Sequence, residues 1–236
     1  MKRAREYYDE FSLRYDTGRD RGYHALVDEL EAGLVAAYGA GGRILEAGCG
    51  TGLILERLRG KCSSCVGADL SRGMLLRARE RGFTVLQSDV TALPFKDAVF
   101  DVTYSFKVLP HVPGLAQALG ELVRVTRPGG YVLAEFYNPL SLRWLVRTLK
   151  GPTKISSEST DREVYTRYLR WKEIMGSIPA GCRLAAVRGI RIYTPHPVML
   201  SFPVVGPVLR LMETRCCDGP LRRFAGFVIL VLQRSD

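Results

Sequence analysis

Short apolar runs of strand length recur along the first 140 residues, and stretches with helical periodicity separate them. The runs are bounded by Gly, Pro, Asp or Ser and lie at positions 43–47, 64–68, 83–87, 99–104 and 131–136. Buried strands that alternate with amphipathic helices predict a parallel sheet covered by helices on both faces. This is the doubly wound α/β architecture.

Two of the intervening helices have recognisable boundaries. Ser71 is a favourable N-cap for a helix with Met74 on its inner face, and Gly82 supplies a C-terminal stop. A second helix opens near Pro113 and ends before residues 127–130. Its apolar positions follow the helical spacing of one buried face: Leu115, Ala118, Leu119, Leu122 and Val123.

The alternation changes after residue 138. Residues 139–160 are basic and turn-rich, and residues 161–175 predict a helix for which Thr160 is a candidate cap. Residues 183–193 and 224–232 predict two closing strands. Between these strands, a proline-interrupted apolar stretch at 195–209 predicts a cover over another part of the molecule.

The first 40 residues predict a helical arm. Its second half has the periodicity of a helix that covers the sheet. Its first half is rich in aromatic residues: Tyr7, Tyr8, Phe11 and Tyr15. This aromatic half either packs against the rest of the protein or forms a flap over a ligand.

Composition and charge narrow the class of protein. The 236 residues are 47% hydrophobic and 25% charged, as in a globular protein, and we expect a single domain over residues 1–236. The net charge of +10 is spread along the chain, so a dedicated nucleic-acid surface is not favoured. No apolar run has the length of a membrane span, and no signal peptide is recognisable at the N-terminus. The expected location is the cytoplasm.

The six cysteines do not predict a disulfide scaffold. Cys62 and Cys65 have the spacing of half a zinc site or of a redox pair, but no second ligand pair follows them. We therefore expect reduced cysteines that act as small buried apolar residues, the adjacent Cys216 and Cys217 included. No metal site is predicted.

A glycine-spaced turn after the first strand carries the main functional signal. The segment Glu46-Ala-Gly-Cys-Gly-Thr-Gly52 allows positive φ angles and close approach of a ligand to the backbone. Asp69 ends the second strand 21 positions after Gly48, where a carboxylate accepts hydrogen bonds from ribose hydroxyls. Together these features predict a site for an adenosine-containing cofactor.

The turn distinguishes between adenosine cofactors. A dinucleotide site has the spacing G-x-G-x-x-G, whereas this turn has G-x-G-x-G. Glu46, two residues before the first glycine, would repel a phosphate and attract a cationic amino group. S-adenosylmethionine has such an amino group and no phosphate.

Six segments in this order and spacing resemble the class I S-adenosylmethionine-dependent methyltransferases. They are Glu46–Gly52, Gly67-Ala-Asp-Leu-Ser71, Ser88-Asp-Val-Thr-Ala-Leu-Pro-Phe95, Phe100-Asp-Val102, Leu109-Pro-His-Val112 and Val123-Arg-Val-Thr-Arg-Pro-Gly-Gly130. The resemblance covers residues 42–138, and it is to the small-molecule branch that includes the ubiquinone and menaquinone C-methyltransferases. It implies a mostly parallel seven-stranded Rossmann-like sheet with an antiparallel last strand and a helical or loop lid.

The resemblance also implies roles for individual residues around S-adenosylmethionine. Glu46, Gly48, Cys49 and Gly50 would lie at its methionine part, and Asp69 at the ribose hydroxyls. The adenine would meet Asp89 and the Val90 backbone between the apolar walls Leu70 and Leu93. Ser105 and Phe106 would lie beside the reactive methyl group, and Tyr15 would reach over from the arm.

Methyl transfer from a sulfonium is an in-line displacement, for which a general base is optional. His111, after the fourth strand, is the best candidate for a base, with a structural hydrogen-bonding role as the alternative. His196 lies in the apolar cover and is a second candidate. Tyr137 and Asn138 end the fifth strand and would face the acceptor pocket.

We expect the acceptor pocket to form from the arm and from lid segments at 139–175 and 194–222. Arg143 and Arg147 either bind an anionic group or form the solvated face of a short helix that packs Trp144, Leu145 and Leu149 inward; the second interpretation is favoured. The apolar cover favours a small lipophilic or aromatic metabolite and raises peripheral contact with a membrane surface as a hypothesis.

Other functions remain open at this point. One is an RNA methyltransferase, although Tyr104-Ser-Phe-Lys107 lacks a nucleic-acid signature of the NPPY type. The others are a NAD-dependent oxidoreductase and a non-catalytic module that binds S-adenosylmethionine. The sequence indicates neither the acceptor atom nor an oligomeric state.

Overall fold

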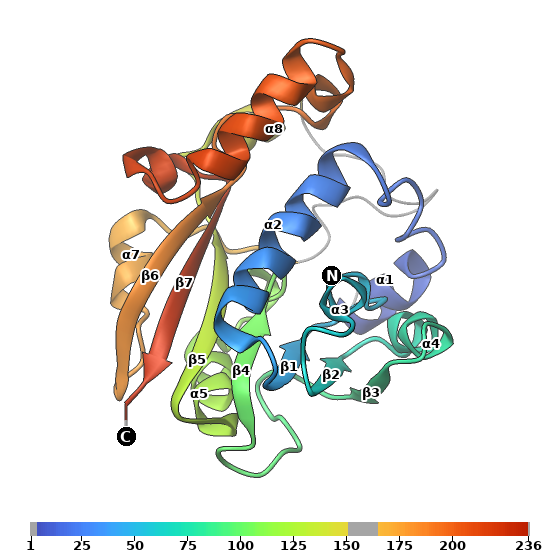
Figure 1. Ribbon diagram of the computed structural model, residues 1–236, viewed down its shortest axis with the longest axis vertical. Coiled ribbons are helices and arrows are strands. Elements are labelled where there is room, and N and C mark those ends of the chain that lie inside the picture. Colours follow the sequence, from blue (N-terminus) through green and yellow to red (C-terminus); the bar gives the residue numbers. More distant parts are fainter. Residues whose placement is uncertain (1–3, 151–164, 236) are drawn as a thin grey trace.

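A computed structural model describes residues 4–150 and 165–235, which form a seven-stranded sheet with helices on both faces (Figure 1). The strand order is β3-β2-β1-β4-β5-β7-β6, and β7 runs antiparallel to both of its neighbours. The strands are β1 (Arg43–Ala47), β2 (Ser64–Asp69), β3 (Thr84–Gln87), β4 (Phe100–Ser105), β5 (Thr126–Tyr137), β6 (Cys182–Ile190) and β7 (Phe227–Arg234). The predicted fold class is confirmed, including the antiparallel last strand.

The helices divide between the two faces. They are α1 (Ala4–Phe11), α2 (Gly22–Gly39), α3 (Leu53–Leu58), α4 (Arg72–Glu80), α5 (Leu115–Val125), α6 (Leu142–Lys150), α7 (Trp171–Gly176) and α8 (Val205–Arg215), with 3-10 turns η1 (Leu109–His111), η2 (Pro197–Ser201) and η3 (Pro220–Phe224). One buried cluster joins α5 and α7 to the sheet, and another joins α2 and α3 to the opposite face.

The last strand shows why these apolar runs form a two-sided core. In β7, Val228 and Leu230 pack with α5 and α7, whereas Ile229 and Val231 pack with α2 and α3. Side chains alternate between the faces of a strand, so a strand covered on both faces is apolar throughout. Each fully buried side chain of this size stabilises the fold by about 1.5–3 kcal/mol.

The start of α4 confirms the predicted cap. The Ser71 hydroxyl accepts a hydrogen bond from the Met74 backbone N–H at 3.1 Å. The helix ends at Glu80, and Gly82 follows it with a φ of +82°. This cap lies directly after the end of β2, so it fixes the direction in which the chain leaves the sheet.

The helix predicted over residues 161–175 is confirmed for residues 171–175 and wrong for residues 165–170. Residues before 165 lie outside the described part of the chain, and the helix begins only at Trp171. The backbone N–H groups of Arg167 and Leu169 donate to the carbonyls of Pro110 and Tyr137, at 2.7 and 2.9 Å. Because these distant carbonyls accept the N–H groups, the segment does not close into a helix before Trp171.

The strand predicted over residues 183–193 ends early, at Ile190. The Glu213 carboxylate on α8 accepts hydrogen bonds from the backbone N–H groups of Ile192, Tyr193 and Thr194, at 2.9–3.0 Å. Those groups are therefore lost to the sheet. The other closing strand begins three residues later than predicted, because residues 220–224 form η3.

The prediction that all cysteines are reduced is wrong for one pair. Cys62 and Cys65 are joined by a disulfide bond, while Cys49, Cys182, Cys216 and Cys217 are free. Cys62 lies in the turn before β2 and Cys65 within this strand, so their Cα atoms are 6.2 Å apart, a separation that a disulfide spans.

The predicted inward packing of α6 is also wrong in part. Leu145 and Leu149 are exposed, whereas the Arg143 guanidinium lies 4.4 Å from the centre of the Tyr137 ring and 4.8 Å from that of Phe227. The arginine thus packs on aromatic rings while the leucines face outward. Within the described ranges, no helix is both long and apolar enough to cross a bilayer.

Candidate active site

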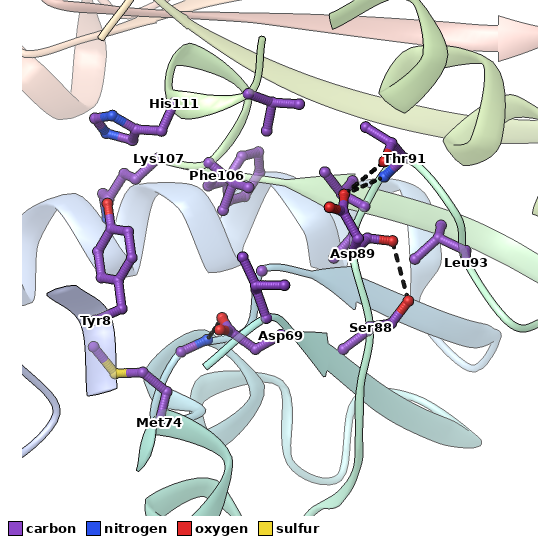
Figure 2. Close-up of a pocket in the computed structure, with 18 of the residues that line it drawn as sticks. Tyr8, Asp69, Met74, Ser88, Asp89, Thr91, Leu93, Phe106, Lys107 and His111 are labelled. Carbon is purple, nitrogen blue, oxygen red and sulfur yellow. Dashed lines mark hydrogen bonds between the residues drawn. The ribbon is translucent and has the colours of Figure 1, made fainter. Parts of the chain in front are cut away.

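A cavity of about 440 Å³ opens at the carboxyl ends of β1, β2, β3 and β4 (Figure 2). Its wall is mainly apolar and aromatic, with a few polar groups. The residues that the argument uses are Tyr8, Tyr15, Gly48, Gly50, Asp69, Leu70, Asp89, Val90, Leu93, Phe106, Lys107, Val108 and His111. Ligands of open α/β sheets bind at this edge, because the strand ends and following turns converge there.

The glycine turn lets the backbone form one wall of the cavity. Gly48 has a φ of +88°, and a Cβ atom added to it would lie 2.0 Å from Val108 Cγ2. The backbone N–H groups of Gly48 and Cys49 both donate to the Ala68 carbonyl, which ties the turn to β2. Only glycine satisfies the backbone conformation and the close approach together.

Asp69 is held rigidly at the end of β2. Its Oδ2 accepts a hydrogen bond from the Gly50 N–H and its Oδ1 accepts one from the Ser71 N–H, both at 2.8 Å. Burial raises the pKa of this carboxyl above its ordinary value, while these backbone donors act in the opposite direction. The carboxylate is thus pre-oriented at the cavity, with lone pairs remaining for ribose hydroxyls.

Asp89, Val90 and Leu70 also line the cavity, and the sequence resemblance predicts them around an adenine. Asp89 Oδ1 accepts hydrogen bonds from the Thr91 backbone N–H at 2.8 Å and from its hydroxyl at 2.7 Å (Figure 2). This carboxylate therefore also shapes its own turn. The turn-forming role and the proposed role toward adenine are compatible, because a carboxylate has a second oxygen.

The aromatic arm contributes directly to the cavity. Tyr8 and Tyr15 both line it, which supports the interpretation of the arm as a flap. Asp9 attaches the arm to the start of α4: its Oδ1 accepts from the Ser71 hydroxyl at 2.6 Å and from the Gly73 N–H at 2.8 Å.

A second aspartate secures the other end of the arm. Asp16 accepts hydrogen bonds from the Thr51 hydroxyl at 2.6 Å and from Arg81 at 2.7 Å. Sequence reasoning missed both Asp9 and Asp16, because their partners lie 35 to 65 positions away.

A smaller recess of about 40 Å³ adjoins the glycine turn and is lined by three acidic and two basic residues. These are Asp28, Glu31, Glu46, Arg19 and Lys107. Glu46 is buried, and its Oε2 has no hydrogen-bond partner within the described chain. Burial raises the pKa of the Glu46 carboxyl well above its usual range. An orphaned buried carboxylate oxygen has a strong preference for a cationic partner.

Lys107 was also missed by sequence reasoning, although it lies in this recess. Its Nζ is 2.7 Å from Glu31 Oε2 and 3.1 Å from Asp28 Oδ1, and its backbone N–H donates to Glu135 Oε1. Its φ of +60° is unusual for a residue with a side chain. The buried acids thus hold both the charge and the backbone of Lys107, which follows the cavity residue Phe106.

His111 lies at the cavity, close to Tyr8 (Figure 2). Its Nδ1 is 2.9 Å from the Tyr165 carbonyl oxygen, which can only accept a hydrogen bond. Nδ1 therefore carries the proton in the neutral ring, which leaves Nε2 with a lone pair. Burial lowers the pKa of His111 below its ordinary value, so this neutral form predominates at pH 7.

Several predicted site residues lie elsewhere. Ser105 is buried and donates to the Ala47 carbonyl at 2.8 Å, so it fastens β4 to β1. Tyr137 packs behind the His111 ring, with 5.6 Å between ring centres, and does not line the cavity. Asn138 is buried and its side-chain amide binds the carbonyls of Arg223 and Ala225.

His196 also differs from the prediction. The Nδ1 atom of His196 accepts a hydrogen bond from the Val198 N–H at the start of η2, and this residue lines neither recess. Cys49 lines the small recess together with Glu46, Gly48 and Gly50, the other residues expected at the methionine part.

The predicted lid segments are described only in part, because residues 151–164 lie outside the described ranges. Of the described residues in 139–175 and 194–222, none lines either recess. The wall comes instead from the arm, the strand ends and the turn after β4, where Val108 and Val112 supply apolar surface. Val108 and Val112 lie just after the end of β4, and this position in the sequence could have marked them as residues of the cavity wall.

Comparisons with known proteins identify the family. A methyltransferase domain family matches residues 45–134. The chain is 38% identical over 136 residues to demethylmenaquinone methyltransferase of Mycobacterium marinum. This alignment covers 54% of this chain and 58% of that protein. It is 34% identical over 177 residues to the protein of the same name from Mycobacterium sp. strain KMS, covering 67% of this chain and 73% of that protein. The chain belongs to the class I S-adenosylmethionine-dependent methyltransferase family.

Solved structures agree with this assignment at the level of the fold. A methyltransferase from Thermotoga maritima, described as a possible histamine N-methyltransferase, has a TM-score of 0.69 and 21% identity. The alignment covers 97% of this chain and 98% of that one. At this identity the likeness concerns the fold alone.

The cofactor of this methyltransferase is S-adenosylmethionine, and the residues present fit it. The orphaned Glu46 oxygen suits its amino group, while Arg19 Nε, buried and without a partner among the described residues, suits its carboxylate. The acids of the small recess outnumber its cations, which opposes a pyrophosphate. Asp69, in the wall of the larger cavity, is a carboxylate that suits ribose hydroxyls.

Replacing Asp69 with Ala should weaken S-adenosylmethionine binding about tenfold to a hundredfold. The substitution removes charge-assisted hydrogen bonds worth about 1.5–3 kcal/mol, and it frees the Gly50 and Ser71 N–H groups. Isothermal calorimetry measures the change. Asp101→Ala is the control, because that carboxylate binds Arg43 and Arg127 away from the cavity. Unchanged affinity in Asp69→Ala would contradict the ribose assignment.

Replacing Glu46 with Gln should stabilise the cofactor-free protein and weaken cofactor binding. The raised pKa means that folding favours the protonated form, so stability is lost as pH rises through the folded-state pKa. The variant should therefore melt at least about 2 °C higher at pH 8, with the difference shrinking as pH falls. Its Kd for S-adenosylmethionine should rise about tenfold or more, through loss of the charge.

The matched control is Glu135→Gln, another buried acid of the same cluster that lines neither recess. Its Kd should stay at the wild-type value, because its amide oxygen can still accept the Lys107 N–H. A Glu46→Gln protein that binds the cofactor as tightly as the wild type would remove Glu46 from the cofactor site.

Proposed function

We propose that this methyltransferase methylates a small lipophilic acceptor with an aromatic ring of the quinol type. The observation that carries the proposal is the orientation of His111. Its Nδ1 is committed to the Tyr165 carbonyl, and its Nε2 remains to accept a proton in a mainly apolar cavity. A base is useful for acceptors that lose a proton from oxygen or carbon on methylation.

The cavity wall supports an aromatic acceptor. Tyr8, Phe106, Val108 and Val112 provide rings and branched aliphatic side chains around the space next to His111. The names of the related demethylmenaquinone methyltransferases support the same chemical class of acceptor.

The protein's contribution to the reaction is positioning, exclusion of water and removal of a proton. When bound, S-adenosylmethionine supplies a methyl group on a positively charged sulfur. Glu46, Arg19 and the glycine turn would hold its methionine end, and Asp69 and Asp89 its nucleoside end. The arm, which Asp9 fastens to the start of α4, would exclude water from the cavity. The closed cavity would also hold the two reactants in the orientation that the displacement needs. His111 Nε2 would accept the proton that the acceptor loses.

The cations that line the two recesses do not favour RNA. The cations Arg19 and Lys107 are hydrogen-bonded to buried Asp28 and Glu31, so they have little capacity to attract phosphates. RNA binding requires accessible cations along a groove.

A labelling experiment tests the proposed function. The protein is incubated with methyl-labelled S-adenosylmethionine and, separately, with a polyprenyl naphthoquinol, a polyprenyl benzoquinol or total RNA. We expect label in the organic extract of a quinol reaction and none in RNA. Label in RNA alone would overturn the acceptor class. Tight cofactor binding without transfer to any acceptor would favour the non-catalytic alternative.

A further inference from the structure

Exposed apolar side chains gather in three segments that the methyl-transfer site does not use. Twelve of the sixteen large apolar residues exposed in the described chain lie in these segments. They are Leu140, Leu142, Leu145 and Leu149 at α6, Val198, Phe202, Val204, Val205, Val208 and Leu211 at η2 and α8, and Leu221 and Phe224 at η3. We call these twelve residues the apolar surface.

The sheet topology places the three segments at one edge. α6 follows the end of β5, η2 and α8 follow the end of β6, and η3 precedes the start of β7. Since β7 runs antiparallel to both neighbours, these three points lie at the same edge of the sheet, where Figure 1 shows α8. The Asn138 amide joins two of the segments by donating to the carbonyls of Arg223 and Ala225.

Basic residues outnumber acidic residues in these segments. Residues 139–150, 195–212 and 219–227 contain no Asp or Glu. They contain six basic residues: Arg143, Arg147, Lys150, Arg210, Arg222 and Arg223. Three carboxylates border these ranges, and each is already paired: Glu29 with Arg210, Asp218 with Arg188, and the buried Glu213 with backbone N–H groups. This edge thus combines exposed leucine, valine and phenylalanine with an excess of cations.

We propose that the apolar surface docks this protein on an anionic lipid bilayer. Solvent-exposed apolar patches of this extent normally have a partner. A bilayer interface buries apolar side chains at the level of the acyl chains and attracts basic residues to the lipid headgroups. The docking places the edge of the sheet with the cofactor cavity toward the membrane.

The two most exposed members of the surface provide the test. Leu149 and Val204 have exposed fractions of 78% and 77%, so their replacement by Asp leaves the core intact. Controls are Leu76→Asp, an exposed leucine on α4 at the far side of the sheet, and Lys61→Glu, an exposed cation before the start of β2. Thermal unfolding checks that each variant is folded.

The protein of residues 1–236 is sedimented with phosphatidylglycerol–phosphatidylcholine vesicles and with pure phosphatidylcholine vesicles. We expect binding to the anionic vesicles that weakens with added NaCl, and a loss of about tenfold or more in each of Leu149→Asp and Val204→Asp, with both controls at the wild-type level. Absence of binding, equal binding to both vesicle types, or equal loss in the controls would overturn the proposal. So would a wild-type dimer that these two substitutions convert to a monomer, because the surface would then belong to a second copy.

Discussion

Replacing His111 with Gln should lower kcat by about 10²–10⁴-fold and leave the Kd for S-adenosylmethionine at its wild-type value. General-base catalysis contributes about this much to rate, and Gln has no basic nitrogen. The side-chain amide of Gln can still donate a hydrogen bond to the Tyr165 carbonyl, which Nδ1 of His111 now binds. The substitution therefore removes the proton acceptor and preserves the structural contact. Steady-state kinetics with a quinol acceptor, together with calorimetry for the cofactor, measures the two effects.

The pH dependence separates a catalytic His111 from a structural one. Burial lowers its pKa, so the ring stays neutral at pH 7 and becomes protonated only below the ordinary imidazole value of about 6.5. The wild-type rate should be flat near neutrality and fall as pH decreases through the lowered pKa. The His111→Gln variant should lack this limb. A variant with wild-type kcat, or one that keeps the acid limb, would contradict the assignment of His111 as the base.

Replacing Gly48 with Ala should weaken S-adenosylmethionine binding about a hundredfold and lower thermal stability. At a φ of +88° a side chain is strained by about 1–3 kcal/mol, and the added Cβ would lie 2.0 Å from Val108 Cγ2. The turn must then move away from Val108, which changes the wall of both recesses. Calorimetry and thermal unfolding measure the two effects.

Two further variants resolve the causes of the Gly48→Ala effect. Gly41 also has a positive φ, of +75°, but a Cβ atom added there meets nothing within 4 Å. Gly41→Ala should therefore lose a little stability and no cofactor affinity. Adding Val108→Ala to Gly48→Ala should restore part of the lost stability by removing the contact. Wild-type affinity in Gly48→Ala would show that the cofactor does not depend on this turn.

The parts of the fold that depend on local chemistry could be predicted from the sequence. The Ser71 cap needs only a hydroxyl and the N–H group three residues later. The strands could be found because burial on both faces requires uninterrupted apolar runs, of which β7 is the clearest. The glycine turn and Asp69 could be predicted because their spacing reflects the geometry of a strand, a turn and a helix.

The parts that depend on distant partners could not be predicted. Asp9 and Asp16 fasten the arm through residues far along the chain, and nothing near them in the sequence marks that role. Residues 165–170 do not close into a helix because carbonyls of Pro110 and Tyr137 accept their N–H groups, which overrides their helical pattern. Likewise, Glu213 ends β6 from a separate helix. Lys107 was overlooked because its place in the small recess depends on buried acids, such as Glu31, that lie far from it in the sequence.

A calorimetric titration of the protein with S-adenosylmethionine and with NAD+ tests most directly whether the acid-lined glycine turn selects a cationic, phosphate-free nucleoside. We predict one molecule of S-adenosylmethionine bound per chain and no heat of binding with NAD+. Binding of NAD+ in the presence of an intact Glu46, or no binding of S-adenosylmethionine, would contradict the account.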